Sequence, residues 1–232
     1  MSTTYYPSYE TLKSTSLQLL ASADFLRLHW KLTDDDISRA ITVLRDPTDE
    51  TSAQERFSAD HPVSKASVTY PPVSSIPVSV EPLDEYAGKW WEAHDLHADK
   101  DDPQFRSCFD ADGSVVHSCG QDRPGDEGPK LEIVAPLGHF VNVGQYVGAA
   151  HPWLRSLDHQ LRLVKGEIGS WTLDPHVLLI VRPSQPSPLR IDGHEGWTPS
   201  NVDDHWRTLA KTAKNLLERR ARENVPEQRQ DA

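Results

Sequence analysis

The most constraining feature of this sequence is the segment from residue 200 to 223, where apolar side chains recur at helical spacing. The stripe consists of Val202, Trp206, Leu209, Ala213, Leu216 and Leu217. Because residues spaced by three and four positions share one face of a helix, the segment predicts a long C-terminal amphipathic helix. We expect its apolar stripe to pack on the protein's own core.

The polar side of the same predicted helix carries a row of cations. These are Arg207, Lys211, Lys214, Arg219, Arg220 and Arg222. A basic amphipathic helix can dock into a groove of another protein or onto an anionic surface. A protein partner bound through this helix therefore stays open as an alternative to packing within the chain.

Shorter patterns upstream predict both strands and helices. Residues 26–32 alternate apolar and polar side chains, which is typical of a half-buried strand, and the apolar run 177–181 predicts a strand buried on both faces. Runs at 76–80 and 131–135 predict two more strands. Helices are expected to begin near Ser8, Thr33, Leu83, Asn142 and His151, the last with Pro152 in its first turn and Gly166 at its end. The predicted fold class is α+β, with about five helices packed on a small, mostly short-stranded sheet.

Two stretches, 46–75 and 98–130, are rich in Asp, Pro and Ser and show no sustained apolar period. They predict long irregular loops. Within the second loop, Asp112-Gly113 predicts a hairpin turn. We expect one α+β domain over residues 1–223, followed by a disordered tail at 224–232.

The net charge of −11 excludes two classes of binder. A non-specific nucleic-acid coat and a protein of anionic membrane surfaces both need positive charge. The most apolar window, 133–150, is interrupted by Pro136, His139, Asn142 and Gln145, so we expect no membrane-spanning helix. The first residues lack the pattern of a secretory signal. These features predict a soluble, acidic protein of the cytoplasm or nucleus.

Four residues form the only candidate metal site, a zinc set made of His94, His97, Cys108 and Cys119. Zinc takes four nitrogen or sulfur ligands in a tetrahedron, and a His pair spaced by three with two cysteines could supply them. The spacing is not that of a zinc finger. A Cys108–Cys119 disulfide across a hairpin and a pair of reduced cysteines are the alternatives. No other cofactor is expected.

Motifs of nucleophilic, nucleotide-binding and metalloprotease sites are absent from the sequence. His151 and His176, each beside a proline, are expected to serve as helix caps or as buried hydrogen-bonding residues. We therefore expect a non-catalytic interaction or regulatory protein, with an enzyme using a His/carboxylate site and a small zinc-stabilised module as alternatives. Polar side chains converging in a pocket beside a strand end would favour the enzyme, and an exposed apolar patch would favour interaction.

Overall fold

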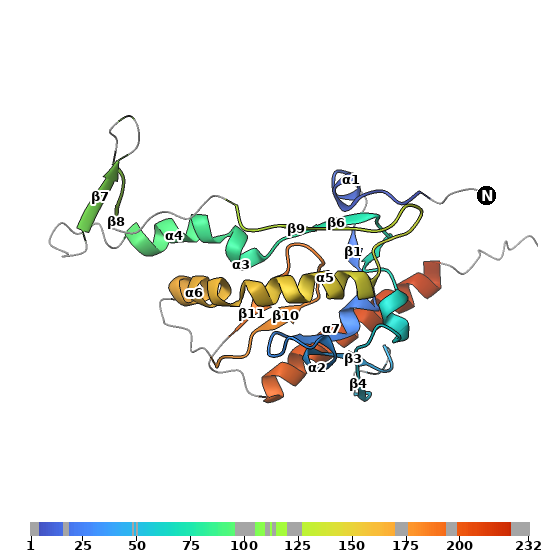
Figure 1. Ribbon diagram of the computed structural model, residues 1–232. Helices are drawn as coiled ribbons and strands as arrows, with labels where there is room; N and C mark the ends of the chain where they lie inside the picture. The colour runs from blue at the N-terminus through green and yellow to red at the C-terminus, as the bar shows by residue number, and fades with distance from the viewer. Residues whose placement is uncertain are drawn as a thin grey trace, which may run out of the picture.

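A computed structural model describes most of the chain (Figure 1). The described residues are 5–15, 19–47, 49, 51–95, 105–109, 112, 115–119, 127–169, 176–193 and 199–223. Helices and antiparallel sheets are both present, which confirms the expected mixed α+β class. Over these ranges there are seven α-helices and two short 3-10 helices, more than the five expected.

The main sheet has five antiparallel strands in the order β11-β10-β2-β3-β4. Their bounds are Arg190–Asp192 for β11, Ile180–Arg182 for β10, Leu28–Lys31 for β2, Ile41–Leu44 for β3 and Gln54–Arg56 for β4. Trp30 of β2 lies opposite Ile41 on one side and Val181 on the other. The strands predicted at 26–32 and 177–181 are therefore neighbours, although they lie far apart in the sequence.

Three smaller sheets each consist of one antiparallel pair. They are β1 (Leu20–Ala21) with β5 (Thr69–Tyr70), β6 (Ser75–Val78) with β9 (Leu131–Val134), and β7 (Phe105–Phe109) with β8 (Val115–Cys119). The runs at 76 and 131 thus pair with each other in a sheet of their own. This corrects the expectation that they would share one sheet with the runs at 26 and 177. Phe109 lies opposite Val115, so the β7–β8 hairpin brackets the predicted turn at Asp112-Gly113.

Helices cover both faces of the main sheet. Adjacent residues of β2 point to opposite faces, and each of the two contacts a different helix. The Trp30 indole N–H donates to His151 Nδ1 at 3.0 Å, and His151 belongs to α5 (Val143–Ser156). The His29 ring stacks on Trp206 of α7 (Pro199–Glu223), with ring centres 4.7 Å apart. Figure 1 shows α5 and α6 (Asp158–Gly169) in line across the molecule.

The C-terminal helix α7 packs on the protein's own core, as the stripe predicts. Trp206, Leu209 and Ala213 are only 2, 7 and 0% exposed, and Leu216 packs partly buried against the same core. The side chains of Arg207, Lys211, Lys214 and Arg219 are exposed on the other side of the helix. The apolar face of α7 is therefore already covered within the chain.

The predicted start of α5 is confirmed, but the predicted helix beginning at His151-Pro152 is wrong. Asn142 caps α5 through a reciprocal pair of hydrogen bonds with Gln145. Pro152 lies inside this helix, where its missing N–H would have bonded the carbonyl of Gly148. Gly148 is exposed, so water can hydrate that carbonyl. The next helix, α6, begins at Asp158 and continues past Gly166 to Gly169.

Two predicted helices are shorter than expected. Ser8 caps α1 (Tyr9–Lys13) as predicted, but the hydroxyls of Ser14 and Thr15 donate to backbone carbonyls and the helix stops there. Helix α2 (Ile37–Ala40) is a single turn capped by Asp36 and not by Thr33. The chain then enters β3, because pairing with β2 outweighs the helical spacing of residues 37–44.

The segment 46–75 is not an irregular exposed loop. It contains β4, a 3-10 helix η2 (Pro62–Lys65) and β5, and it buries Phe57, Val63, Val68 and Val73. Its apolar residues are too widely spaced to show a period, yet each reaches the core. The single-domain division at residue 223 stays a prediction, and the tail 224–232 lies outside the described residues.

No helix in the described part of the chain is both long and apolar enough to cross a membrane.

Candidate functional site

A polar cleft of about 430 Å³ opens where α6 meets two short helices and the end of the main sheet. The short helices are α3 (Glu81–Asp84) and α4 (Tyr86–Asp95). Among the described side chains that line the cleft, four are cations and three are carboxylates: Lys89, Lys165, Arg182, Arg190, Glu81, Glu85 and Asp192. We refer to it as the basic cleft. Its size lies in the range of small-molecule sites, roughly 300 to 1,000 Å³.

Strand register places the sheet's contribution to the basic cleft. Arg182 of β10 lies opposite Arg190 of β11, and Asp192 follows two residues later. Because side chains alternate along a strand, these three side chains leave the same face of the sheet. Lys165 of α6 lines the cleft with them.

Backbone hydrogen bonds hold α3 against β11. The Leu189 N–H donates to the Ser79 carbonyl at 2.7 Å, and the Glu81 N–H donates to the Leu189 carbonyl at 2.9 Å. Glu81 is the first residue of α3, so its carboxylate meets the next residue of the strand, Arg190, at 2.7 Å. A local junction thus sets one wall of the basic cleft.

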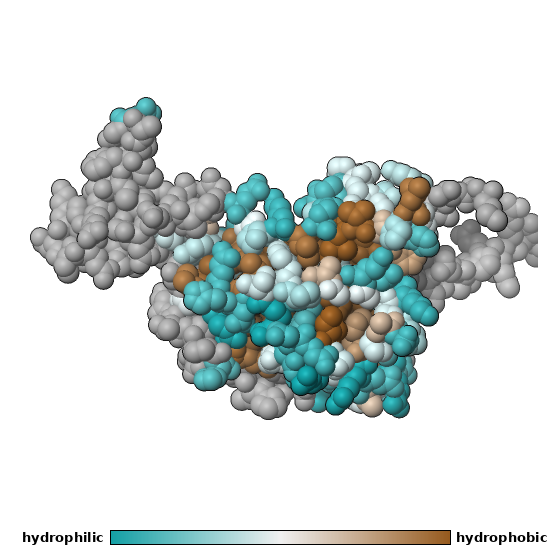
Figure 2. All heavy atoms as spheres, viewed as in Figure 1, coloured by the Kyte–Doolittle hydropathy of each residue, from teal (hydrophilic) through white to brown (hydrophobic). Residues whose placement is uncertain are grey.

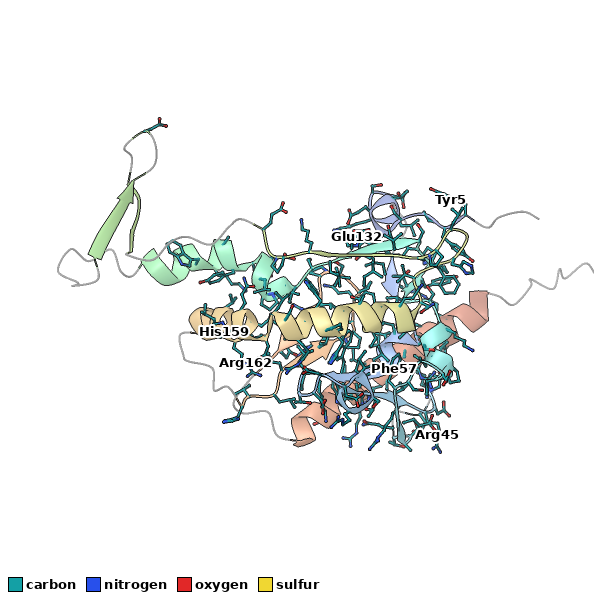
Figure 3. All side chains as sticks on the ribbon, viewed as in Figure 1. Tyr5, Arg45, Phe57, Glu132, His159 and Arg162 are labelled. Atoms are coloured by element: carbon teal, nitrogen blue, oxygen red, sulfur yellow. The ribbon has the colours of Figure 1, made fainter. Side chains whose placement is uncertain are left out.

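Arg162 ties helix α6 to the segment that leads into β10. Its Nη1–H donates to the Val177 carbonyl at 2.9 Å, and its Nε–H donates to Asp158 at 2.8 Å. Figure 3 shows Arg162 on the side of α6 that faces the strands. This anchor fixes the position of Lys165, one turn further along α6.

Each carboxylate of the basic cleft is engaged by a cation. Glu81 accepts from Arg190, Asp192 accepts from Arg182, and Glu85 accepts from Lys89. The hydrogen bond and charge of Glu81 raise the pKa of Arg190 further. The carboxylates are therefore held in ion pairs and do not act as free bases.

Lys165 is the exception among the four cations. It is half-buried, and among the described residues its ammonium makes no hydrogen bond or ion pair. Burial lowers its pKa, since desolvation disfavours the charged form. The charges of Asp192 and Glu81 oppose this shift, whereas those of Lys89 and Arg182 add to it. The basic cleft thus contains one cation in excess of its ion pairs.

This arrangement suits an anionic ligand. Three ion pairs and one excess ammonium give the lining a positive balance within a chain of net charge −11. A guanidinium carries five N–H donors, so Arg182 and Arg190 keep donors beyond those used by their carboxylate partners. A carboxylate or phosphate in the basic cleft would find both a charge and directed donors.

No family model, curated protein or solved structure matches this chain.

Two other cavities have less to offer a polar ligand. A mostly apolar groove of about 530 Å³ lies beside α5, with Ile37, Phe57 and Gly148 in its lining. Phe57 is labelled in Figure 3. Its carboxylate, Asp36, already accepts from Ser38 and Arg39. A smaller cavity of about 180 Å³ adjoins the stacked His29 and Trp206 rings.

Buried titratable groups of the core are committed to structural hydrogen bonds. His151 accepts from Trp30 at Nδ1 and donates from Nε2 to the Asp34 carbonyl at 2.8 Å. This confirms its expected role as a buried hydrogen-bonding residue. Tyr146 donates to the Pro186 carbonyl, and burial raises the pKa of its hydroxyl well above the ordinary value. Neither group is available for catalysis.

The predicted zinc residues are not brought together by any described contact. His94 belongs to α4, His97 lies outside the described residues, and Cys108 and Cys119 lie in β7 and β8. The hairpin register pairs Cys108 with His117 and Cys119 with Phe105. Where side chains are described, no three His, Cys, Asp or Glu residues gather around a possible metal. The zinc set stays an untested prediction.

We expect purified protein to contain less than one equivalent of zinc, and a chelator to leave its melting temperature unchanged. The reason is that the ligand spacing does not match a structural site. In a zinc-stabilised module the metal's binding free energy is folding free energy, so chelation would destabilise the fold. Elemental analysis and thermal melts with and without chelator measure both quantities. Stoichiometric zinc with a lowered melting temperature would contradict this expectation.

The sequence interpretation missed the basic cleft entirely. Its cations come from helices and strands spread between residues 89 and 190, and no short motif joins them. The only local signal is Lys165, which borders the apolar stripe formed by Leu161 and Val164. A lysine beside an apolar stripe is common, because its methylene stem covers apolar surface.

Proposed function

We propose that the protein is a non-catalytic regulatory protein that binds a small anionic ligand in the basic cleft. The observation that supports this most directly is Lys165, a half-buried cation with no hydrogen bond or ion pair to the described residues. A desolvated charge is costly unless it is compensated, and a bound anion compensates it. The ion-paired carboxylates favour binding over acid–base catalysis.

An enzyme with a His/carboxylate site stays an alternative to this proposal. Polar side chains do converge beside strand ends, which was the criterion for an enzyme, but no histidine lies among the described lining residues. The lining is one of ammonium and guanidinium groups with paired carboxylates. Such a lining recognises carboxylates and phosphates through charge and hydrogen bonds.

The test is calorimetric titration of the full chain with sulfate, whose charge is constant near neutral pH. Lys165→Met removes the excess ammonium and keeps an unbranched side chain of similar length. We expect it to weaken sulfate binding roughly tenfold or more, since hydrogen bonds to charged groups are worth about 1.5 to 3 kcal/mol. Binding by the parent protein should also weaken as pH rises, because the lowered pKa of Lys165 discharges it earlier than an ordinary lysine.

The matched control is Lys13→Met, which removes an exposed lysine of α1 that lines none of the three cavities. Its sulfate affinity should equal that of the parent protein. Equal losses in both variants would mean that sulfate responds to net charge alone, and the proposed function would fall. Melting temperatures without sulfate verify that both variants are folded.

A second candidate function, binding of a protein partner, has two supporting observations. The exposed cations of α7 face away from the core, so an acidic partner could meet them without disturbing the packed stripe. Val134 and Leu137 are 65 and 92% exposed, and Figure 2 shows hydrophobic surface around β6, β9 and the turn that follows. The exposed cations support the interaction role proposed for α7. Arg220 belongs to the same helix, but its side chain is not among those described.

A further inference from the structure

The amine of Lys165 has a second chemical property beyond its charge. An amine is a nucleophile only when it is not protonated, and most lysines are protonated at neutral pH. Burial is the main cause that lowers the pKa of Lys165, and it outweighs the opposing charges of Asp192 and Glu81, while Lys89 and Arg182 add to the lowering. The surroundings of Lys165 in the basic cleft therefore also increase the fraction of its amine that is unprotonated.

The groups around Lys165 match a ligand with two functions. Arg182 and Arg190 leave one face of the sheet side by side and keep spare N–H donors, which suit a carboxylate. Lys165 lines the same cleft but belongs to helix α6, whereas the two arginines belong to strands. A ligand whose carboxylate is held by the arginines would present its adjoining atoms to the helix side of the cleft.

We propose that Lys165 captures the carbonyl carbon of a small 2-oxo acid as an imine in the basic cleft. This inference rests on the proposed anion-binding function and adds a covalent step to it. A 2-oxo acid carries a carboxylate for the arginines and, on the next carbon, a carbonyl for the amine. The cleft volume of about 430 Å³ accommodates a molecule of this size.

The step is balanced without any further reactant. The Lys165 nitrogen attacks the carbonyl carbon and forms a C–N bond, while the carbonyl electron pair moves to oxygen. One amine proton is transferred to that oxygen to give a carbinolamine. The nitrogen then gives up its second proton to the same oxygen, and that oxygen leaves as water as the C–O bond breaks and the C=N bond forms. The protons are exchanged with solvent, because the cleft carboxylates Glu81 and Asp192 are held in ion pairs with Arg190 and Arg182.

The experiment uses the full chain with pyruvate as the probe and borohydride as the trapping reductant. Reduction converts an imine into a stable secondary amine, and peptide mass spectrometry then locates the adduct. We expect adduct on Lys165 at neutral pH in several-fold excess over that on the exposed Lys13. The excess should shrink as pH rises and ordinary lysines lose their protons too.

Lys165→Arg is the matched variant, because it keeps the positive charge and cannot form an imine. It should bind lactate, which has the carboxylate of pyruvate but no carbonyl, within a few-fold of the parent protein. It should yield no adduct above the level of exposed lysines. Retained lactate binding also shows that the variant is folded.

Three results would overturn the inference in distinguishable ways. Lactate and sulfate binding without any pyruvate adduct on Lys165 would remove the imine and leave the proposed anion site intact. Equal adduct on Lys165 and Lys13 would show ordinary surface reactivity and would also remove the imine. Absence of both anion binding and adduct would remove the proposed function together with the inference.

Discussion

Replacing Leu209 by Ala is expected to lower the free energy of unfolding by about 2 to 5 kcal/mol, the usual cost of truncating a buried leucine. Leu209 is 7% exposed and packs in the core cluster beside Trp206 and Ala213. The loss combines the transfer free energy of the removed methyl groups with the cavity they leave. Since a domain is stable by only about 5 to 15 kcal/mol, this is a large share of the total.

Denaturant unfolding and thermal melts measure the effect of Leu209→Ala. The matched control is Leu216→Ala, the same truncation two turns later on α7, where the side chain is only partly buried. We expect a smaller loss of stability there, because folding buries less apolar surface of the side chain at that position. Equal and negligible losses in both variants would contradict the packing of α7 on the core and would favour a docking role for its stripe.

Replacing His151 by Leu is expected to lower the free energy of unfolding by about 2 to 6 kcal/mol, because two hydrogen bonds lose their partner. The Trp30 indole N–H would lose its acceptor in the core, and the Asp34 carbonyl would lose its donor. Each buried polar group left unpaired costs about 1 to 3 kcal/mol. His151→Gln, which can both accept and donate, should retain more of the stability than the Leu variant.

His151 also predicts how stability depends on pH. Burial is the main cause that lowers its pKa, and nearby Arg155 acts in the same direction, against Asp34 and Asp35. In the unfolded chain the group takes up a proton near its ordinary pKa of about 6.5. Between that value and the lower folded one, the unfolded state binds more protons, so stability falls as pH falls. Above about pH 6.5 this contribution is complete.

Unfolding free energies measured from pH 8 down to pH 5.5 test this prediction. The parent protein should lose stability on acidification through this window, and His151→Gln should show a flatter profile. Parallel profiles for the two proteins would show that other groups cause the pH dependence. Carboxylates contribute mainly at lower pH, since their ordinary pKa values are near 4.

The elements that sequence patterns predicted are those specified by neighbouring residues. The stripe of α7 and the Asn142 cap of α5 are complete within a few turns, and both are present as predicted. The failures occur where distant contacts decide. Residues 41–44 have helical spacing but become β3, because β2 offers a partner for pairing. Likewise, Pro152 remains inside α5 because Trp30 and His151 hold that turn against the sheet.

The basic cleft could not have been predicted from the sequence for a similar reason. A charged residue reveals nothing about its partners until the fold places them, and Arg182, Arg190 and Glu81 meet only through strand pairing and the start of α3. Lys165 is distinguished by what it does not contact. Its half-burial and lowered pKa are properties of the assembled cleft, and they have no counterpart in residue spacing.

The position of β2 between β3 and β10 has a consequence for synthesis of the chain. While the ribosome is still making the middle of the protein, β2 can pair with β3 on one side, but its other edge has no strand beside it. That edge stays open until β10 is made, and the face of β2 that packs on α7 stays uncovered until α7 is made. An open strand edge readily pairs with other chains, so chains cut short before β10 should aggregate. Until β10 is made, β2 therefore presents the kind of edge that makes a partly folded chain prone to aggregation.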